Sequence, residues 1–342
     1  MAGGMMRVGI PRYRLPAEVL DSEITAIEDF GVEIKLDSRV ESLDELFAQG
    51  YNAVFVGAGA HRGISMRIEG EDIAGIVDGA DFLREVGLGR EVKVGARVAV
   101  IGGGNVAIDA ARTALRLGAK DASIVYRRTR AEMPASPEEV EEALEEGVKI
   151  EYLAAPVRAM SVNGKLKVEF IRMELGAVDA SGRRRPQPME GSEFDGTYDM
   201  MIKAIGQESE LPDRFGLVAK RGGRIEVDPD ALATSREGVY AGGDVVSGPA
   251  SVIEAIAAGR QAAISIDRYF GGEGNIDEVL APQEEVLPYD ISEIEGEKHR
   301  PPMKMLPLEG RLTCFAQAVI GFDGEKATEE TKRCLRCDLE EH

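Results

Sequence analysis

"ARVAVIGGGNVAIDAARTALRLGA" (residues 96–119) runs from a short apolar stretch through three consecutive glycines into an alanine-rich segment that closes at Gly118. An apolar run of this kind is typical of a strand buried on both faces, and the segment after the glycines has the length of a helix. Apolar runs and glycine-bounded helices alternate along much of the chain, which is typical of α/β proteins. We therefore predict an α/β fold.

The glycine turn has the GxGxxA spacing of a dinucleotide-binding site, with Gly102, Gly104 and Ala107 at its small positions. The first glycine permits a tight turn, the second lets the backbone approach a pyrophosphate, and the small third residue lets helix and strand pack closely. The helix N-terminus offers unpaired N–H groups to the anion. A plain glycine-rich turn is the alternative, and the strand–turn–helix context favours the dinucleotide.

The next apolar run ends in VYRRTR, which supplies Arg127, Arg128 and Arg130 but no carboxylate. In a site for NAD an acidic residue about 20 residues beyond the glycines accepts the ribose 2′-hydroxyl. Guanidinium forks match the oxygens of a 2′-phosphate instead. This favours NADPH over NADH, and the alternative is a cluster of exposed arginines on a loop.

A second strand–turn–helix pattern, EGVYAGGDVVSGPASVIEAIAAGRQAA, occupies residues 237–263. Asp244 follows the strand and could accept a hydrogen bond from a cofactor hydroxyl. The helix that starts near Ser251 would direct its positive end at an electron-rich ring. Taken alone, the pattern fits a βα turn with a capping aspartate nearly as well.

Other segments give simpler predictions. Strands are expected at 32–37, 51–60 and 122–128, a helix at 15–31 closed by Gly31, a variable β segment at about 157–200 and an irregular surface arm from Gly272 onward. In the helix at 136–147, Ser136 and Glu139 would form a capping box, the glutamates would face solvent, and Val140, Ala143 and Leu144 would face inward.

The composition excludes several functions. The 342 residues suffice for two domains, and the net charge of −20 argues against a nucleic-acid surface. No apolar run is long enough to span a membrane and no signal peptide is recognisable, so we expect a cytoplasmic protein. Three cysteines cannot form a disulfide framework, and the three histidines lack partners at metal or triad spacing, which disfavours histidine-based hydrolysis.

Together these motifs resemble the small (β) subunit family of NADPH-dependent glutamate synthase, among the FAD- and NAD(P)-binding flavoproteins of the pyridine nucleotide-disulfide oxidoreductase type. The resemblance follows the chain in order through GGMMRVGIPRYRLP, VFVGAGA, VAVIGGGNVAID, IVYRRTRAEMPAS, IKAIGQ, GVYAGGDVVSGPASVIEAIAAGRQAA and RCLRCD. It implies two Rossmann-like domains, with an NAD(P) domain (80–205) inserted into an FAD domain (1–79 and 206–285), and a C-terminal arm (286–342). VFVGAGA and IKAIGQ would be the crossover strands between the two domains.

The resemblance also implies site residues. The NADPH pyrophosphate would be held by Gly102, Gly104, Asn105 and Ala107, and the 2′-phosphate by Arg127 and Arg128. The FAD ribityl chain and pyrophosphate would meet Gly243 and Asp244. A helix N-terminus would be presented to the flavin pyrimidine edge by Ser251 and Val252. The isoalloxazine would be bordered by Gly9, Ile10 and Pro11. The family's first strand–GxGxxG–helix, which holds the ADP half of FAD, has no counterpart here, so the FAD site is expected to be partial and apolar core to be exposed.

Cys334 and Cys337 have the spacing of two iron–sulfur ligands, and a [4Fe–4S] cluster would need further ligands from a partner or a missing segment. Reduced thiols without a role, redox thiols and zinc are the alternatives. The resemblance implies hydride transfer from NADPH to FAD and electron release to iron–sulfur centres of other redox subunits. A non-catalytic NADPH-binding subunit or a truncated product without its own flavin is the alternative, and a self-contained disulfide reductase is disfavoured because no CxxC precedes a helix near the proposed flavin.

Overall fold

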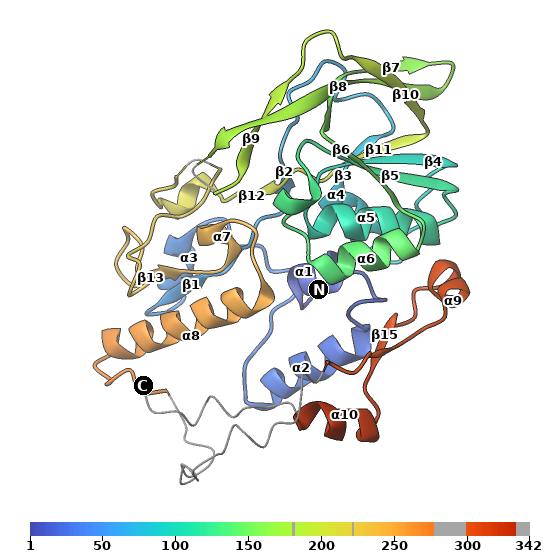
Figure 1. Cartoon of the computed structure of the whole chain (residues 1–342). Helices are drawn as coiled ribbons and strands as arrows, with labels where there is room; N and C mark the ends of the chain where they lie inside the picture. Colours follow the sequence, from blue (N-terminus) through green and yellow to red (C-terminus); the bar gives the residue numbers. More distant parts are fainter. Residues whose placement is uncertain (180–181, 221, 277–298, 333–342) are drawn as a thin grey trace.

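The computed structural model describes residues 1–179, 182–220, 222–276 and 299–332, and Figure 1 shows the chain as an α/β protein whose two main sheets are one parallel and one antiparallel sheet. The larger of these is a five-stranded parallel sheet in the order β3-β11-β4-β5-β6. Its strands are Ile76–Asp78, Met200–Lys203, Arg97–Ile101, Asp121–Tyr126 and Lys149–Tyr152 in that order. The predicted strands at 96–101 and 122–128 are therefore neighbours at the middle of the sheet.

Both faces of this sheet are covered, which is why β4 is a continuous apolar run. Val98 and Val100 pack against helices on one face, whereas Ala99 and Ile101 pack against an antiparallel sheet on the other. The helices are α4 (Gly79–Gly87), α5 (Asn105–Arg116) and α6 (Pro137–Glu145). The antiparallel sheet contains β7 (Ala154–Val162), β8 (Lys165–Val178), β9 (Arg184–Pro188) and β10 (Phe194–Tyr198).

A second, smaller core forms where distant parts of the chain meet. β1 (Val54–Val56) pairs in parallel with β13 (Val239–Ala241), and side chains such as Leu43, Phe215 and Ile225 pack around them. The chain leaves this pair through β2 (Arg62–Gly63) and returns through β12 (Gln207–Glu208), which pair with each other. The surrounding helices are α3 (Leu43–Ala48), η2 (Asp213–Phe215), α7 (Asp244–Ser247) and α8 (Val252–Tyr269).

The terminal segments lie against the helices that cover the parallel sheet. The N-terminal segment forms α1 (Gly4–Val8) and α2 (Ala17–Asp29), and Gly31 with its positive φ of 91° follows α2 as predicted. The C-terminal segment carries β14 (Lys304–Met305), α9 (Leu308–Thr313), β15 (Val319–Gly321) and α10 (Gly324–Thr331). No helix of the described residues is both long and apolar enough to cross a membrane.

Two predictions about the surface were wrong. Residues 32–37 form no strand, because within the described residues they have no ladder partner, and Val32 and Leu36 are each 52% exposed. The segment from 299 to 332 is not an irregular arm, since α9 packs on α5 and Arg311 is buried beside Glu145 and Glu146. Residues 277–298 of the expected arm lie outside the described residues.

The helix at 136–147 is present as α6, but three details of its prediction were wrong. Ser136 and Glu139 form no capping box, because Ser136 donates to Glu138 while Glu139 pairs with Arg14. Leu144 faces solvent. Glu146 is buried, because two arginines of α5 bind its carboxylate there.

Candidate functional site

A cavity of about 1410 Å³ lies between the parallel sheet, the N-terminal segment and the small core. It brings together residues that are more than 200 positions apart in the sequence. Of the cofactor-binding residues predicted from the sequence, those that line this cavity are Gly9, Ile10, Gly102, Gly104, Asn105, Arg127, Arg128, Gly243, Asp244, Ser251 and Val252. Pro11 and Ala107, which are both buried, do not line it.

The glycine turn between β4 and α5 has one closed and one open position. Gly102 has a φ of 147°, and a Cβ there would lie 2.1 Å from the carbonyl oxygen of Ala204 on the neighbouring chain segment. Gly104 has extended backbone, and a Cβ there would meet only Pro134, at 3.8 Å. The turn is therefore packed behind and open toward the cavity, as a backbone cradle for a phosphate requires.

Asn105 is the first residue of α5, and its side chain is already engaged. Its Oδ1 accepts a hydrogen bond from the backbone N–H of Ser136 at 3.3 Å, which ties α5 to the start of α6. Its backbone N–H, in the first turn of the helix, has no intrahelical acceptor. The contribution that this residue can make to a bound phosphate is therefore the backbone donor.

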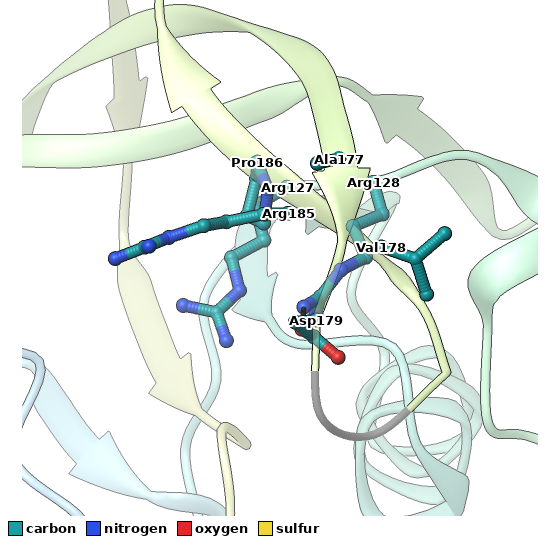
Figure 2. A pocket seen from close by; sticks show the side chains of 7 residues that line it. All are labelled: Arg127, Arg128, Ala177, Val178, Asp179, Arg185 and Pro186. Atoms are coloured by element: carbon teal, nitrogen blue, oxygen red, sulfur yellow. Dashed lines mark hydrogen bonds and ion pairs between the residues drawn. The ribbon is translucent and has the colours of Figure 1, made fainter.

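The two arginines after β5 have different surroundings. Arg127 is exposed at the cavity wall, whereas Arg128 is buried, with its Nη2 2.8 Å from Oδ2 of Asp179 and its Nε donating to the carbonyl of Arg184 at 2.8 Å. In Figure 2 the side chain of Arg128 ends beside Asp179. Arg127 is therefore the more accessible of the two predicted phosphate ligands.

On the opposite side of the cavity, the Gly-Gly-Asp turn leads through α7 into α8. Gly243 has a positive φ of 71°, and the carboxylate of Asp244 accepts the backbone N–H of Ala250 at 3.2 Å. Burial raises the pKa of Asp244, while the Ala250 N–H and the nearby His61 oppose this effect. Asp244 thus fixes the loop that precedes α8.

The N-terminus of α8 has a capping box. Ser251 accepts the N–H of Glu254 at 3.2 Å, and the Glu254 carboxylate accepts the backbone N–H of Ser251 at 2.8 Å. One donor of this N-terminus is therefore already occupied by a carboxylate, and the remaining free donors begin at Val252. Ile253 and Ile256 of α8 are 75% and 62% exposed.

The sequence reasoning missed a charged pair in the cavity wall. Nη1 of Arg14 lies 2.7 Å from Oδ2 of Asp109, and both residues line the cavity. Burial raises the pKa of Asp109 to about 7, although Arg14 opposes this effect. The Oδ1 atom of Asp109 has no hydrogen-bond partner in the described part of the chain. Its position one helical turn after Asn105, on the same face of α5, was the available sequence signal.

Behind this wall lies a buried charged cluster that joins α5 to α6. The guanidinium groups of Arg112 and Arg116 both bind the carboxylate of Glu146, at 2.6–3.0 Å. The ring of Tyr13, which is 1% exposed, stacks against both arginines, with centroid distances of 4.9 and 3.9 Å. The cluster holds the N-terminal segment against the helix that follows the glycine turn.

The predicted iron–sulfur ligands, Cys334 and Cys337, lie outside the described residues. Cys314 is a free thiol that donates to the carbonyl of Gly310. Among the described residues, no group of three or more His, Cys, Asp or Glu side chains is placed to hold a metal ion.

Comparison with known proteins shows the family. Residues 16–259 match the family of pyridine nucleotide-disulphide oxidoreductases. The β subunit of the NADP(+)-dependent formate dehydrogenase of Moorella thermoacetica is 44% identical over 98% of this chain and 50% of its own length. The β subunit of the NADPH-Fe(3+) oxidoreductase of Geobacter sulfurreducens is 39% identical over 98% of this chain and 56% of its own length. The chain thus spans about half the length of these relatives.

Two further comparisons agree with this result. The small chain of the glutamate synthase [NADPH] of Azospirillum brasilense is 37% identical over 78% of this chain and 59% of its own length. Among solved structures, Mycobacterium tuberculosis FprA in complex with NADPH has the same fold, with a TM-score of 0.65 over 78% of this chain and 75% of that chain at 17% identity. These matches confirm the α/β dinucleotide-binding fold and the resemblance seen in the sequence: the chain belongs to the pyridine nucleotide-disulphide oxidoreductase family.

Proposed function

We propose that this chain is the electron-input part of a redox enzyme, in which it takes hydride from NADPH and passes electrons through FAD to iron–sulfur centres of partner subunits. The observation that carries the proposal is the single cavity lined by residues of two separate nucleotide-binding patterns. The relatives support the same function, because their names describe β subunits or small chains of enzymes that use NADPH or NADP(+).

On the NADPH side, the pyrophosphate would lie over Gly104 and accept hydrogen bonds from the first N–H groups of α5. This backbone is open to the cavity, whereas Gly102 is packed against Ala204 and shapes the turn. Arg127 would bind the 2′-phosphate, because a guanidinium group offers two parallel donors to phosphate oxygens.

On the FAD side, Gly243 and Asp244 would meet the ribityl chain, Val252 would offer its backbone N–H to the ring, and Gly9 and Ile10 would border it. Where both cofactors are bound, NADPH supplies a hydride and the flavin accepts it and can release electrons one at a time. The protein's part is to align the two rings and exclude water, which agrees with the lack of a nucleophile–base pair among the predicted site residues.

We further propose that the FAD site is completed by chain that is not part of this sequence, and that Cys334 and Cys337 serve a cluster shared with such a segment or a partner. The exposed apolar residues at the start of α8, which are Val252, Ile253 and Ile256, support the first statement, because neighbouring exposed apolar side chains mark surfaces that another segment covers. The cytoplasm, where thiols remain reduced, suits both statements.

The visible spectrum of the purified full chain tests the proposal. Flavin absorbance that bleaches when NADPH is added anaerobically would support the electron-input function. A protein that binds NADPH but takes up no FAD, even when assembled with the chain that completes the site, would overturn it in favour of a non-catalytic NADPH-binding subunit. An Arg214→Gln variant, which changes an exposed arginine outside the cavity, is the control for nonspecific loss of cofactor.

A further inference from the structure

A second pocket, of about 580 Å³, adjoins the main cavity at the end of β5. Arg127 and Arg128 belong to both, and the β8–β9 hairpin supplies the rest of the second pocket, which is Ala177, Val178, Asp179, Arg185 and Pro186. Figure 2 shows the side chains of Arg127 and Arg185 extending to the same side of the pocket. The sequence analysis assigned no role to this hairpin.

A register shift in the hairpin occurs opposite Arg185. Leu175 pairs with Pro186 and Val178 pairs with Arg184, so two residues of β8 lie opposite one residue of β9, which is Arg185. Bulges of this kind increase the local twist and redirect a side chain. Arg185 thus extends from the point in the hairpin where the bulge alters the twist.

Arg128 connects this hairpin to the main sheet. Its guanidinium binds Asp179 at the end of β8 and the carbonyl of Arg184 at the start of β9, each at 2.8 Å. A second link joins Arg184 Nε to Glu132 at 2.7 Å. Both strands of the hairpin are thus held against the loop that follows β5, close to Arg127.

We propose that Arg185 and Arg127 together bind the 2′-phosphate of NADPH, and that Arg128 is a positioning residue that holds the hairpin so that Arg185 reaches the ligand. This inference rests on the proposed use of NADPH, and it assigns the phosphate to one arginine from the sheet and one from the hairpin. It differs from the sequence prediction, in which Arg127 and Arg128 were the two ligands.

The charges in the pocket support an anionic ligand. The side chains of Arg127 and Arg185 have no hydrogen bond or ion pair with any other described residue, whereas the Arg128 and Arg184 side chains are paired with carboxylates. Desolvation, and next the neighbouring Arg128, lower the pKa of Arg127. The net charge of the protein is −20, yet positive charge is concentrated in this pocket. A phosphate dianion between the guanidinium groups of Arg127 and Arg185 would relieve the repulsion between them.

Binding of 2′,5′-ADP, 5′-AMP, NADPH and NADH to the full chain, measured by isothermal titration calorimetry, tests the assignment. We expect Arg185→Gln to weaken 2′,5′-ADP and NADPH about 10- to 100-fold, the usual effect of losing a charge-assisted hydrogen bond, and to change 5′-AMP and NADH less than about twofold. Arg214→Gln is the matched control, because it removes one exposed arginine from a site outside both pockets. Unchanged binding of 2′,5′-ADP by Arg185→Gln would overturn the assignment.

The role of Arg128 is tested by a double-mutant cycle with Arg185. If Arg128 acts through the hairpin, Arg128→Gln should weaken 2′,5′-ADP in the wild-type background but add less than about twofold in the Arg185→Gln background. Additive losses would mean that Arg128 contacts the phosphate itself and would overturn its positioning role. Arg128 is buried, and Arg128→Gln could fail to fold. In that case Asp179→Asn is used instead, because it breaks the same ion pair from the more exposed partner and should give the same non-additive pattern.

The same titrations separate this inference from the proposed function. A wild-type chain that binds 2′,5′-ADP no better than 5′-AMP would contradict the use of NADPH itself. A wild-type chain that prefers 2′,5′-ADP, with a preference that survives Arg185→Gln, would contradict only the hairpin.

Discussion

The glycine turn gives the sharpest prediction, because its first and third glycines have opposite surroundings. An alanine at position 102 would place its Cβ 2.1 Å from the Ala204 carbonyl oxygen, where ordinary contact begins at 3.4 Å, and would keep a φ of 147°. The clash requires a shift of more than 1 Å in tightly packed backbone. With the strain of the left-handed conformation, we expect Gly102→Ala to lower the free energy of unfolding by about 3 kcal/mol.

An alanine at position 104 should behave differently. The backbone there is extended, with φ −94° and ψ −179°, and the nearest atom to a new Cβ is 3.8 Å away. The free energy of unfolding should therefore change by less than about 1 kcal/mol, in the stabilising direction, because alanine restricts the unfolded chain. The methyl group would occupy the space above the turn, and NADPH binding should weaken at least about tenfold, which is about 1.4 kcal/mol.

Urea denaturation and calorimetric titration with NADPH measure the two effects on the same samples. Gly104→Ala that binds NADPH as tightly as the wild type would refute the assignment of the phosphate to this turn. Gly102→Ala with unchanged stability would refute the close approach to Ala204. The pair thus separates a glycine needed for folding from a glycine needed for binding.

Three other predictions test the surroundings of the cavity. Glu146→Gln should lower the free energy of unfolding by about 3–5 kcal/mol, because two buried arginines lose their shared carboxylate. Glu145→Gln, at the exposed end of the ion pair with Arg311, should lower it by less than about 1 kcal/mol. Similar losses for the two variants in urea denaturation would contradict this contrast. The pKa of Asp109 is raised by burial from 3.8 to about 7, so its contribution to stability is present below pH 4 and is lost as the pH rises through 7. Asp109→Asn should remove this part of the pH dependence of the unfolding free energy, and an unchanged slope between pH 4 and pH 8 would argue against a protonated carboxyl. Asp244→Ala should reduce the flavin content after gel filtration, because the loop before α8 loses the acceptor of the Ala250 N–H. Asp244→Asn keeps an oxygen for this hydrogen bond and should retain more flavin. Equal flavin content in the wild type and both variants would show that Asp244 does not support the flavin.

Local patterns predicted the elements that depend on neighbouring residues. The strand, turn and helix from 96 to 119 could be recognised because a buried parallel strand is continuously apolar and the glycines at its end have few other uses. The small-residue turn before Asp244 was assigned only together with the other motifs of the resemblance. These patterns also placed most of the cofactor-binding candidates, which the structure brings into one cavity.

Predictions that depended on a partner far away in the sequence were the ones that were wrong. Glu139 has the right spacing to close a capping box, but Arg14, 125 residues earlier, binds its carboxylate instead. The segment at 32–37 has a strand-like pattern, and a strand forms only where another strand can pair with it. Neither the contact with Arg14 nor the lack of a pairing strand can be read from the local sequence.

The sequence by itself determined the family, the α/β fold and the two nucleotide-binding patterns, because each of these depends on residue types at short, fixed spacings. Tertiary structure decided which arginines face a common pocket, since Arg185 lies opposite a bulge of the hairpin and Arg128 is bound to Asp179, 51 residues later in the chain. It also decided that Arg14 and Asp109 meet in the cavity wall. Spacing determines local conformation, whereas the partner of a charged side chain is determined only when distant segments pack together.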